Sequence, residues 1–273
     1  MFIPLGFYQG DTGGPAYDTD AQAFFTAVAG GGDTLTTTEK DAVNQLVLDL
    51  KADSIWSDIL YAYPLVGGTA TAHKWNLKNP LDTNAAYRVT WGSVMTHNSL
   101  GIIGTSNNAN SYGDTHYNPS AASATGHTIA MYFNQGLTAT PANEYDYGAY
   151  QNPDDNMISF GFNNKTTMYA CFDSTAYKTS TSGTYTKSVY AGSNNGTNTS
   201  IYQNGSQLTT AAQPFDGVNI NYYLLASNRT VGTDGETGRG IGIAIAYSVG
   251  LDSTEHSNLS TAITDYVTSL SRN

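Results

Sequence analysis

The stretch IYQNGSQL, residues 201–208, decides which fold class to expect. In it, Asn204-Gly205 stands between two strand-like runs, and this dipeptide is a strong signal for a type I′ turn joining antiparallel strands. Similar short runs, separated by clusters of Gly, Asn, Asp and Ser, recur from about residue 66 to residue 249. This texture is typical of an all-β sandwich, so the middle of the chain is expected to form one.

Helical patterns flank this β region on both sides. Residues 36–51 place Thr36 and Glu39 in capping-box spacing, ahead of an apolar stripe made by Val43, Leu46, Val47 and Leu50. Near the C-terminus, Asp252 and Glu255 repeat that spacing before a second apolar stripe. The predicted fold is mainly β: an antiparallel jelly-roll sandwich with N-terminal helices and a C-terminal amphipathic helix.

The sequence divides into three segments. Residues 1–19 are punctuated by Gly and Pro and lack periodicity, which predicts an extended N-terminal arm. Residues 20–64 are predicted to be a helical lead-in that stops at Pro64. Residues 65–273 are predicted to hold the β-sandwich together with the C-terminal helix.

Charge and cysteine content exclude several function classes. The net charge is −11, and the 11 Lys and Arg residues are scattered, so we expect no nucleic-acid partner. No stretch approaches the ~20 apolar residues of a membrane-spanning helix, so no membrane insertion is expected. Cys171 is the single cysteine, which excludes an intrachain disulfide, and its apolar surroundings predict an inert buried thiol.

Several stretches, in order along the chain, carry a resemblance. They are DTDAQAFFTAV (18–28), YPLVGGTATAHKWNLKNPLD (63–82), SYGDTHYNPS (111–120) and YSVGLDSTEHSNLSTAITDYVTSLSR (247–272). Together they resemble a family of bacteriophage virion structural proteins with a concanavalin A-like (laminin-G-like) lectin/glucanase domain. The resemblance implies a jelly-roll sandwich carried on the virion, in a capsid-surface, fibre or tail position, with other virion proteins as partners. It implies no single activity.

An enzymatic alternative rests on Glu144 and Asp146, which would point to one face of a strand. The laminarinase-like enzymes of this sandwich fold place three carboxylates in the pattern E-x-D-x-x-E. Here the third position is Ala149. We therefore expect no catalytic residues and interpret Glu144 and Asp146 as exposed polar residues at a strand edge.

Ligand binding is suggested by the tyrosine content, which reaches 20 residues. Aromatic rings can stack on sugar faces or anchor protein interfaces, although most strand tyrosines pack in the core or on the sheet. The candidate contacts for a host surface glycan are Tyr145, Tyr147, Tyr150 and Asn152. The run INYYLL, residues 220–225, is a second candidate of the same kind.

Asp154 and Asp155, within NPDDN, supply hard oxygen ligands at short spacing and are candidate Ca²⁺ ligands. The same composition is typical of an ordinary turn. No other cofactor is expected.

The arm is the candidate assembly segment, through Phe2, Ile3, Leu5, Phe7 and Tyr8. It has no core of its own and would order best against a neighbouring subunit. The apolar stripe of helix 36–51 needs a partner surface. A homo-oligomer is expected. The predicted function is a non-enzymatic virion protein that displays a lectin-like domain. The alternatives are a secreted lectin and a polysaccharide-degrading glycosidase.

Overall fold

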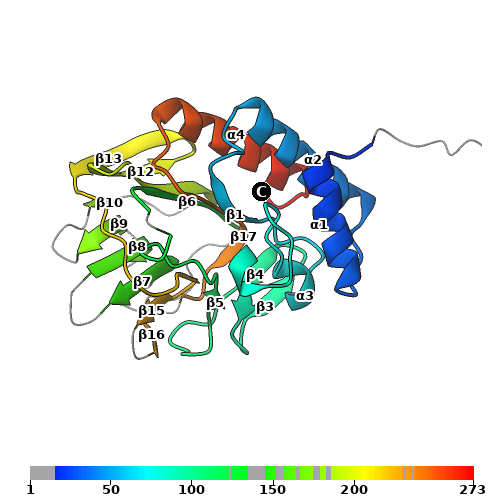
Figure 1. Ribbon diagram of the computed structural model, residues 1–273, viewed down its shortest axis with the longest axis horizontal. Helices are drawn as coiled ribbons and strands as arrows, with labels where there is room; N and C mark the ends of the chain where they lie inside the picture. The colour runs from blue at the N-terminus through cyan, green and yellow to red at the C-terminus, as the bar shows by residue number, and fades with distance from the viewer. Residues whose placement is uncertain are drawn as a thin grey trace, which may run out of the picture.

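A computed structural model describes residues 16–122, 124–134, 145–151, 156–163, 167–174, 179–182, 186–229, 232–234 and 237–273. These residues form three layers (Figure 1). Two β-sheets, here called sheet A and sheet B, pack face to face, and helices cover the other face of sheet A. The predicted β-sandwich with helices from both ends of the chain is confirmed.

Sheet A is the middle layer. Its described strands pair in the order β13-β12-β11-β6-β17-β4-β3, and β1 pairs with β17. All of these pairs are antiparallel. The strands are β1 (Ile59–Tyr63), β3 (Thr96–Asn98), β4 (Gly101–Ile103), β6 (His127–Phe133), β11 (Ser188–Asn194), β12 (Asn198–Gln203), β13 (Ser206–Ala212) and β17 (Gly240–Tyr247).

Sheet B forms the layer farthest from the helices. Its described strands follow the order β10-β9-β8-β7-β14-β5-β2, and β15, paired with β16, joins β7 in parallel. The strands are β2 (Thr90–Trp91), β5 (Gly113–Asp114), β7 (Tyr147–Gln151), β8 (Asn156–Asn163), β9 (Thr167–Ser174), β10 (Thr179–Ser182), β14 (Tyr223–Leu224), β15 (Ser227–Arg229) and β16 (Gly232–Asp234).

The predicted Asn-Gly turn and the two predicted helix N-termini lie where the local sequence signals placed them. Asn204 and Gly205 both have positive φ, 48° and 78°, in the turn that joins β12 to β13. This is the backbone that an Asn-Gly turn of type I′ requires. Helices α2 (Thr37–Ala52) and α4 (Ser253–Ser269) each begin with the predicted capping box.

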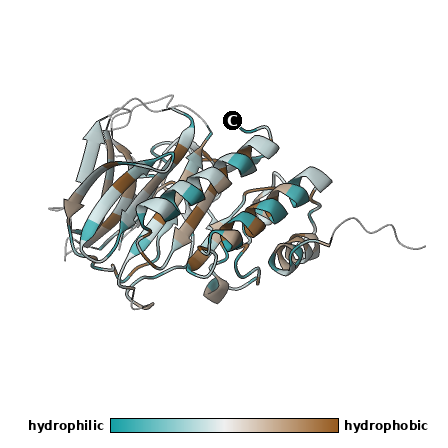
Figure 2. Ribbon diagram, turned by 90° about the horizontal axis from the view of Figure 1, so that it is seen from above, coloured by the Kyte–Doolittle hydropathy of each residue, from teal (hydrophilic) through white to brown (hydrophobic). Residues whose placement is uncertain are grey.

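The helices share one hydrophobic core with sheet A. Helix α1 (Thr19–Gly30) packs on α2, and α2 packs on α4 along one flank of the sandwich (Figure 2). The predicted stripe of α2, Val43, Leu46, Val47 and Leu50, is buried in this core together with Ile243 and Ile245 of β17. The partner surface expected for this stripe is therefore supplied by the chain itself.

The predicted helical lead-in extends too far at its C-terminal end. Helix α2 ends at Ala52, Ser54 adopts a left-handed backbone with φ of 61°, and Ile59–Tyr63 is strand β1. Tyr61 and Tyr63 point into the core between the sheets, while Ala62 points toward the helices. This alternation has the period of a strand, and pairing with β17 stabilises it.

The arm also ends earlier than predicted. Asp18 caps α1, because its side chain accepts a hydrogen bond from the Asp20 amide. The Asp18 carboxylate also pairs with Lys51 at 2.7 Å. Tyr17 packs edge-on against Phe25. Residues 17–19 thus belong to the helical layer, whereas Phe2, Ile3, Leu5, Phe7 and Tyr8 lie outside the described residues.

Arg272 ties the end of the C-terminal segment to the layer below. Its side chain donates hydrogen bonds to four backbone carbonyl oxygens, those of Pro64, Leu65, Ser99 and Gly242, at 2.9–3.3 Å. The residue is only 3% exposed. A buried guanidinium has to be compensated by hydrogen-bond acceptors, and here backbone oxygens from three separate parts of the chain provide them.

Candidate functional site

The three tyrosines predicted to bind a ligand lie in different environments. Tyr147 is fully buried between the sheets, and its hydroxyl lies 2.5 Å from that of Tyr61 and 3.0 Å from Nε2 of His127. Burial lowers the pKa of His127 to about 3, so this imidazole is neutral near pH 7. The prediction of a ligand contact is wrong for Tyr147, because the alternation of β7 points its side chain into the core.

Tyr145 and Tyr150 are half-buried. The ring of Tyr145 packs edge-on against Tyr169, with centroids 5.8 Å apart. The guanidinium of Arg229 lies 5.0 Å from the centroid of Tyr150, in cation–π range. Both tyrosines retain some exposed surface. Asn152, Asp154 and Asp155 lie outside the described residues, and Glu144 does too.

Asp146 is buried, so the prediction that it is an exposed polar residue at a strand edge is wrong. It is fully buried, and Nη1 of Arg239, itself 1% exposed, lies 2.6 and 2.7 Å from its two carboxylate oxygens. The Phe162 amide donates to the same carboxylate. Burial raises the pKa of the Asp146 carboxyl, and the Arg239 guanidinium opposes that shift. Asp146 is thus half of a buried ion pair and not a surface carboxylate.

Two segments of sheet B alternate between the core and the opposite face. Ser111, Gly113, Thr115 and Tyr117 are buried, whereas the residues between them are half-buried. The segment before and within β14 alternates likewise, with Tyr222 and Leu224 in the core. The side chains directed away from the core are Tyr112, Asp114, His116 and Asn118 from the first segment, and Asn219, Asn221 and Tyr223 from the second. We call these seven residues the outer ladder.

The outer ladder is held by contacts between its two segments. The rings of Tyr112 and Tyr223 are stacked, with centroids 4.5 Å apart and planes at 10°. Nδ2 of Asn221 lies 3.2 and 3.3 Å from the two carboxylate oxygens of Asp114 and donates to them. Next along the ladder, Nδ2 of Asn118 donates to Oδ1 of Asn219 at 3.1 Å. Aromatic, carboxylate and amide groups therefore follow one another along a single face.

His116 and Thr90 support the centre of the ladder. The His116 amide donates to Asp114 at 2.8 Å, and Nε2 of its ring lies 2.8 Å from the Thr90 hydroxyl. Burial lowers the pKa of His116, an effect that the nearby Asp114 carboxylate opposes. The Asp114 side chain is 17% exposed. It is thus fixed by two donors and still reaches the surface.

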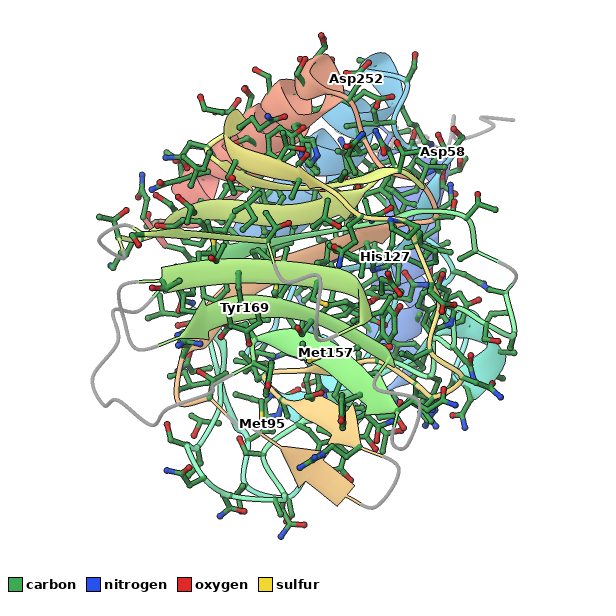
Figure 3. The ribbon with its side chains drawn as sticks, turned by 90° about the vertical axis from the view of Figure 1, so that its left-hand side faces the viewer. Asp58, Met95, His127, Met157, Tyr169 and Asp252 are labelled. Carbon is green, nitrogen blue, oxygen red and sulfur yellow. The ribbon has the colours of Figure 1, made fainter. Side chains whose placement is uncertain are left out.

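Sheet B presents this face on the side opposite the helix layer, where Met157 and Tyr169 mark its strands β8 and β9 (Figure 3). Gly148 follows Tyr223 in the cross-strand row and adds no side chain beside its ring. Gly148 is itself buried, so the surface offered to a ligand is the half-buried Tyr223 ring with the Asp114 carboxylate beside it. Among the described residues, no group of three or more His, Cys, Asp or Glu side chains is placed to hold a metal ion.

The sequence signals found only part of this site. The run 220–225 was a candidate, and it contributes Asn221 and Tyr223. Asp114 was not a candidate, because its value depends on Asn221, a residue 107 positions away. The available signal was the alternation in SYGDTHYN, residues 111–118, which places Tyr112, Asp114, His116 and Asn118 on one face of an extended segment.

Comparison with known proteins supports the fold. No protein-family model matches the chain, and no curated protein sequence does either. A mutant Trypanosoma rangeli sialidase displaying trans-sialidase activity has a similar structure, with a TM-score of 0.55 and 11% identity over 82% of this chain and 39% of that one. A second similar chain belongs to a structure concerned with cell entry of botulinum neurotoxin type C and its interaction with two ganglioside molecules. Its TM-score is 0.51, with 10% identity over 78% of this chain and 53% of that one. At these identities the likeness establishes the fold alone, and this chain spans about half or less of each of these two structures.

Proposed function

We propose that this protein is a non-enzymatic carbohydrate-binding domain and that the outer ladder is its binding surface. The observation that carries the proposal is the stacked pair Tyr112–Tyr223 beside the Asp114–Asn221 contact. A half-buried ring offers an apolar face to the C–H side of a sugar. Asp114 accepts hydrogen bonds from sugar hydroxyls, and a bond to a charged acceptor is among the stronger kinds.

The binding class is favoured over the glycosidase class by the role of Asp146. Most glycosidases use two carboxyl groups that flank the scissile bond, as the laminarinase-like enzymes of this sandwich fold do. Asp146 is instead turned inward to Arg239 and has no exposed surface. Similar proteins with the sandwich fold include a sialidase mutant displaying trans-sialidase activity and a botulinum neurotoxin chain studied with gangliosides. Those descriptions are consistent with a glycan ligand, and the proposal for this chain rests on its own residues.

Replacing Asp114 by asparagine is expected to weaken glycan binding about 10- to 100-fold, since a hydrogen bond to a charged group contributes about 1.5–3 kcal/mol. Tyr223→Ala removes the contact ring and is expected to have an effect of similar size, because truncating a central aromatic contact costs about 2 kcal/mol or more. The measurement is binding of the purified protein to a broad glycan array, followed by titration calorimetry with a retained glycan. Thr210→Ala is the matched control, because it removes the side-chain acceptor of a hydrogen bond from the Ser200 hydroxyl, on sheet A. Unchanged binding in both ladder variants, or no glycan retained by the folded protein, would contradict the proposal.

We further propose that the domain is displayed on a bacteriophage particle, with residues 1–15 as the attachment segment. The support is the sequence resemblance and the apolar side chains Phe2, Ile3, Leu5, Phe7 and Tyr8. Other virion proteins and further copies of this chain would be the partners.

Deleting residues 1–15 is expected to abolish incorporation into particles and to leave the melting temperature unchanged. The deletion spares Tyr17 and Asp18, which contact Phe25 and Lys51. Quantitative mass spectrometry of purified particles measures incorporation, and the full-length chain is the reference. Normal incorporation of the shortened chain would remove the attachment role, and a protein found only outside particles would favour the secreted lectin.

A further inference from the structure

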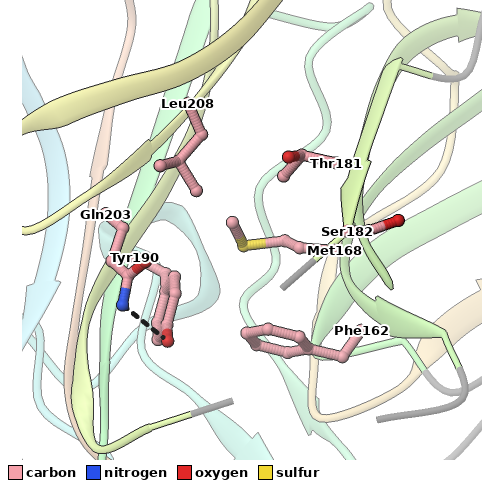
Figure 4. A pocket seen from close by; sticks show the side chains of 7 residues that line it. All are labelled: Phe162, Met168, Thr181, Ser182, Tyr190, Gln203 and Leu208. Carbon is pink, nitrogen blue, oxygen red and sulfur yellow. Dashed lines mark hydrogen bonds between the residues drawn. The ribbon is translucent and has the colours of Figure 1, made fainter. Parts of the chain in front are cut away.

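A small pocket opens between the two sheets at the edge of the sandwich far from the outer ladder. Its volume is about 120 Å³. Sheet B contributes Phe162, Met168, Thr181 and Ser182 from β8, β9 and β10, and sheet A contributes Tyr190, Gln203 and Leu208 from β11, β12 and β13 (Figure 4). We call it the edge pocket, because β10 and β13 are the last strands at this end of their sheets.

The inner wall of the edge pocket is apolar and preformed. Phe162, Met168 and Tyr190 are 4%, 3% and 2% exposed, and the rings of Phe162 and Tyr190 meet edge to face with centroids 5.1 Å apart. Leu208, which is 43% exposed, stands on the opposite side from Thr181. None of the seven residues that line the pocket is charged, so the part of a ligand that enters it must be neutral.

Two polar groups complete the lining. Nε2 of Gln203 donates to the Tyr190 hydroxyl at 3.1 Å, which fixes the side-chain amide in place. In the described structure, the hydrogen bonds of this amide all run through Nε2, so its Oε1 can accept another. Thr181 directs its side chain into the pocket, whereas Ser182 points away from it (Figure 4). The pocket thus combines an acceptor, a hydroxyl donor and an apolar wall.

We propose that the edge pocket binds the acetamido group of an N-acetylated sugar, an inference that rests on the proposed carbohydrate-binding function and names a ligand class for it. The acetamido methyl group packs against Phe162 and Met168. Its carbonyl oxygen accepts a hydrogen bond from the Thr181 hydroxyl, and its N–H donates to Oε1 of Gln203. These three groups match the three kinds of surface that the pocket presents.

The volume of the pocket and the net charge of the chain both favour a small, neutral substituent. Pockets for whole drug-sized molecules measure about 300–1,000 Å³, so a pocket of about 120 Å³ accommodates one substituent while the sugar ring remains at the mouth. The chain carries a net charge of −11, which disfavours strongly anionic glycans. A neutral N-acetylhexosamine fits both restrictions.

The edge pocket is separate from the outer ladder. Strands β10 and β14 stand four strand steps apart in sheet B, which corresponds to about 19 Å at the usual spacing of ~4.8 Å between strands. Variants at one site therefore leave the contacts of the other intact. This separation allows the two proposals to be tested independently.

The test compares N-acetylglucosamine with glucose and N-acetylgalactosamine with galactose, each pair differing in the acetamido group, using saturation-transfer NMR and titration of the full chain. Each acetylated sugar is expected to bind at least tenfold more tightly than its parent, with the strongest saturation on the acetamido methyl group. Thr181→Val, which keeps the shape and removes the hydroxyl, is expected to weaken their binding about fivefold, the usual effect of losing one neutral hydrogen bond. Ser182→Ala is the matched control and is expected to change nothing.

Each outcome decides between the proposals. Equal binding of each acetylated sugar and its parent, no binding of either acetylated sugar, or an unchanged affinity in Thr181→Val would overturn the acetamido pocket. If array binding then depends on Asp114, the proposed function stands without this pocket. If acetylated sugars bind through Thr181 and array binding is unchanged in both Asp114→Asn and Tyr223→Ala, the pocket stands and the outer ladder is not the binding surface.

Discussion

Asp146→Asn is expected to lower the free energy of unfolding by about 3–5 kcal/mol, the usual result of removing one partner of a buried salt bridge. The substitution keeps the size of the side chain and removes its charge. Arg239 then remains buried, at 1% exposure, without its carboxylate. Its bond to the Phe162 carbonyl at 3.1 Å does not compensate a full positive charge. Urea unfolding followed by tryptophan fluorescence and circular dichroism measures the effect.

The double variant Asp146→Asn/Arg239→Met distinguishes the energy of the ion pair from the cost of leaving the Arg239 charge buried without a carboxylate. Because it leaves no unpaired ion in the core, it is expected to be more stable than Asp146→Asn alone. The coupling energy from the four proteins then measures the pair itself. A single variant as stable as the parent protein would show that water reaches Arg239, which contradicts its burial.

Arg272→Ala is the second substitution with a large expected effect, a loss of about 3 kcal/mol or more. It removes the Arg272 donor from the carbonyl oxygens of Pro64, Leu65, Ser99 and Gly242. Pro64 keeps the Tyr266 hydroxyl as a donor and Ser99 is exposed, so the loss falls mainly on the buried bonds to Leu65 and Gly242, and each unsatisfied buried group costs about 1–3 kcal/mol. The guanidinium also lies 6.0 Å from the ring of Tyr266. Thermal and urea unfolding measure the loss.

Two further variants sharpen this result. Arg272→Lys restores the charge but not the planar fork that reaches several acceptors at once, so it is expected to recover only part of the stability. Asn273→Ala tests the next residue, which is exposed and bonds only to Thr268 in the described structure. A melting temperature that is equal in Arg272→Ala and Asn273→Ala would contradict the role given to Arg272.

Sequence patterns that span only a few residues were sufficient to predict much of the fold. The capping boxes of α2 and α4 and the Asn204-Gly205 turn each depend on neighbours no more than three residues apart. Strand β1 was missed because five residues rich in apolar side chains, next to a helix, fit either period. Its pairing with β17, more than 180 residues later in the sequence, decides between them.

The same limit applies to the candidate site. A tyrosine-rich strand predicts that alternate rings share a face, but not which set faces the core. Tyr147 therefore could not be distinguished from Tyr150 before the neighbours of β7 were known. Asp146 and Arg239 are 93 positions apart, so the sequence around Asp146 does not predict that it has a buried partner. The outer ladder likewise exists only once β5 and β14 are paired.

The pairing of β1 with β17 and the contacts of Arg272 also have a consequence during synthesis. Strand β1, helix α2 and Pro64 leave the ribosome long before the segments that complete their contacts. Until residues 240–272 emerge, the apolar faces of α2 and sheet A have no native cover, and such surfaces are prone to aggregation. The nascent chain is therefore expected to depend on chaperones until translation reaches the last helix.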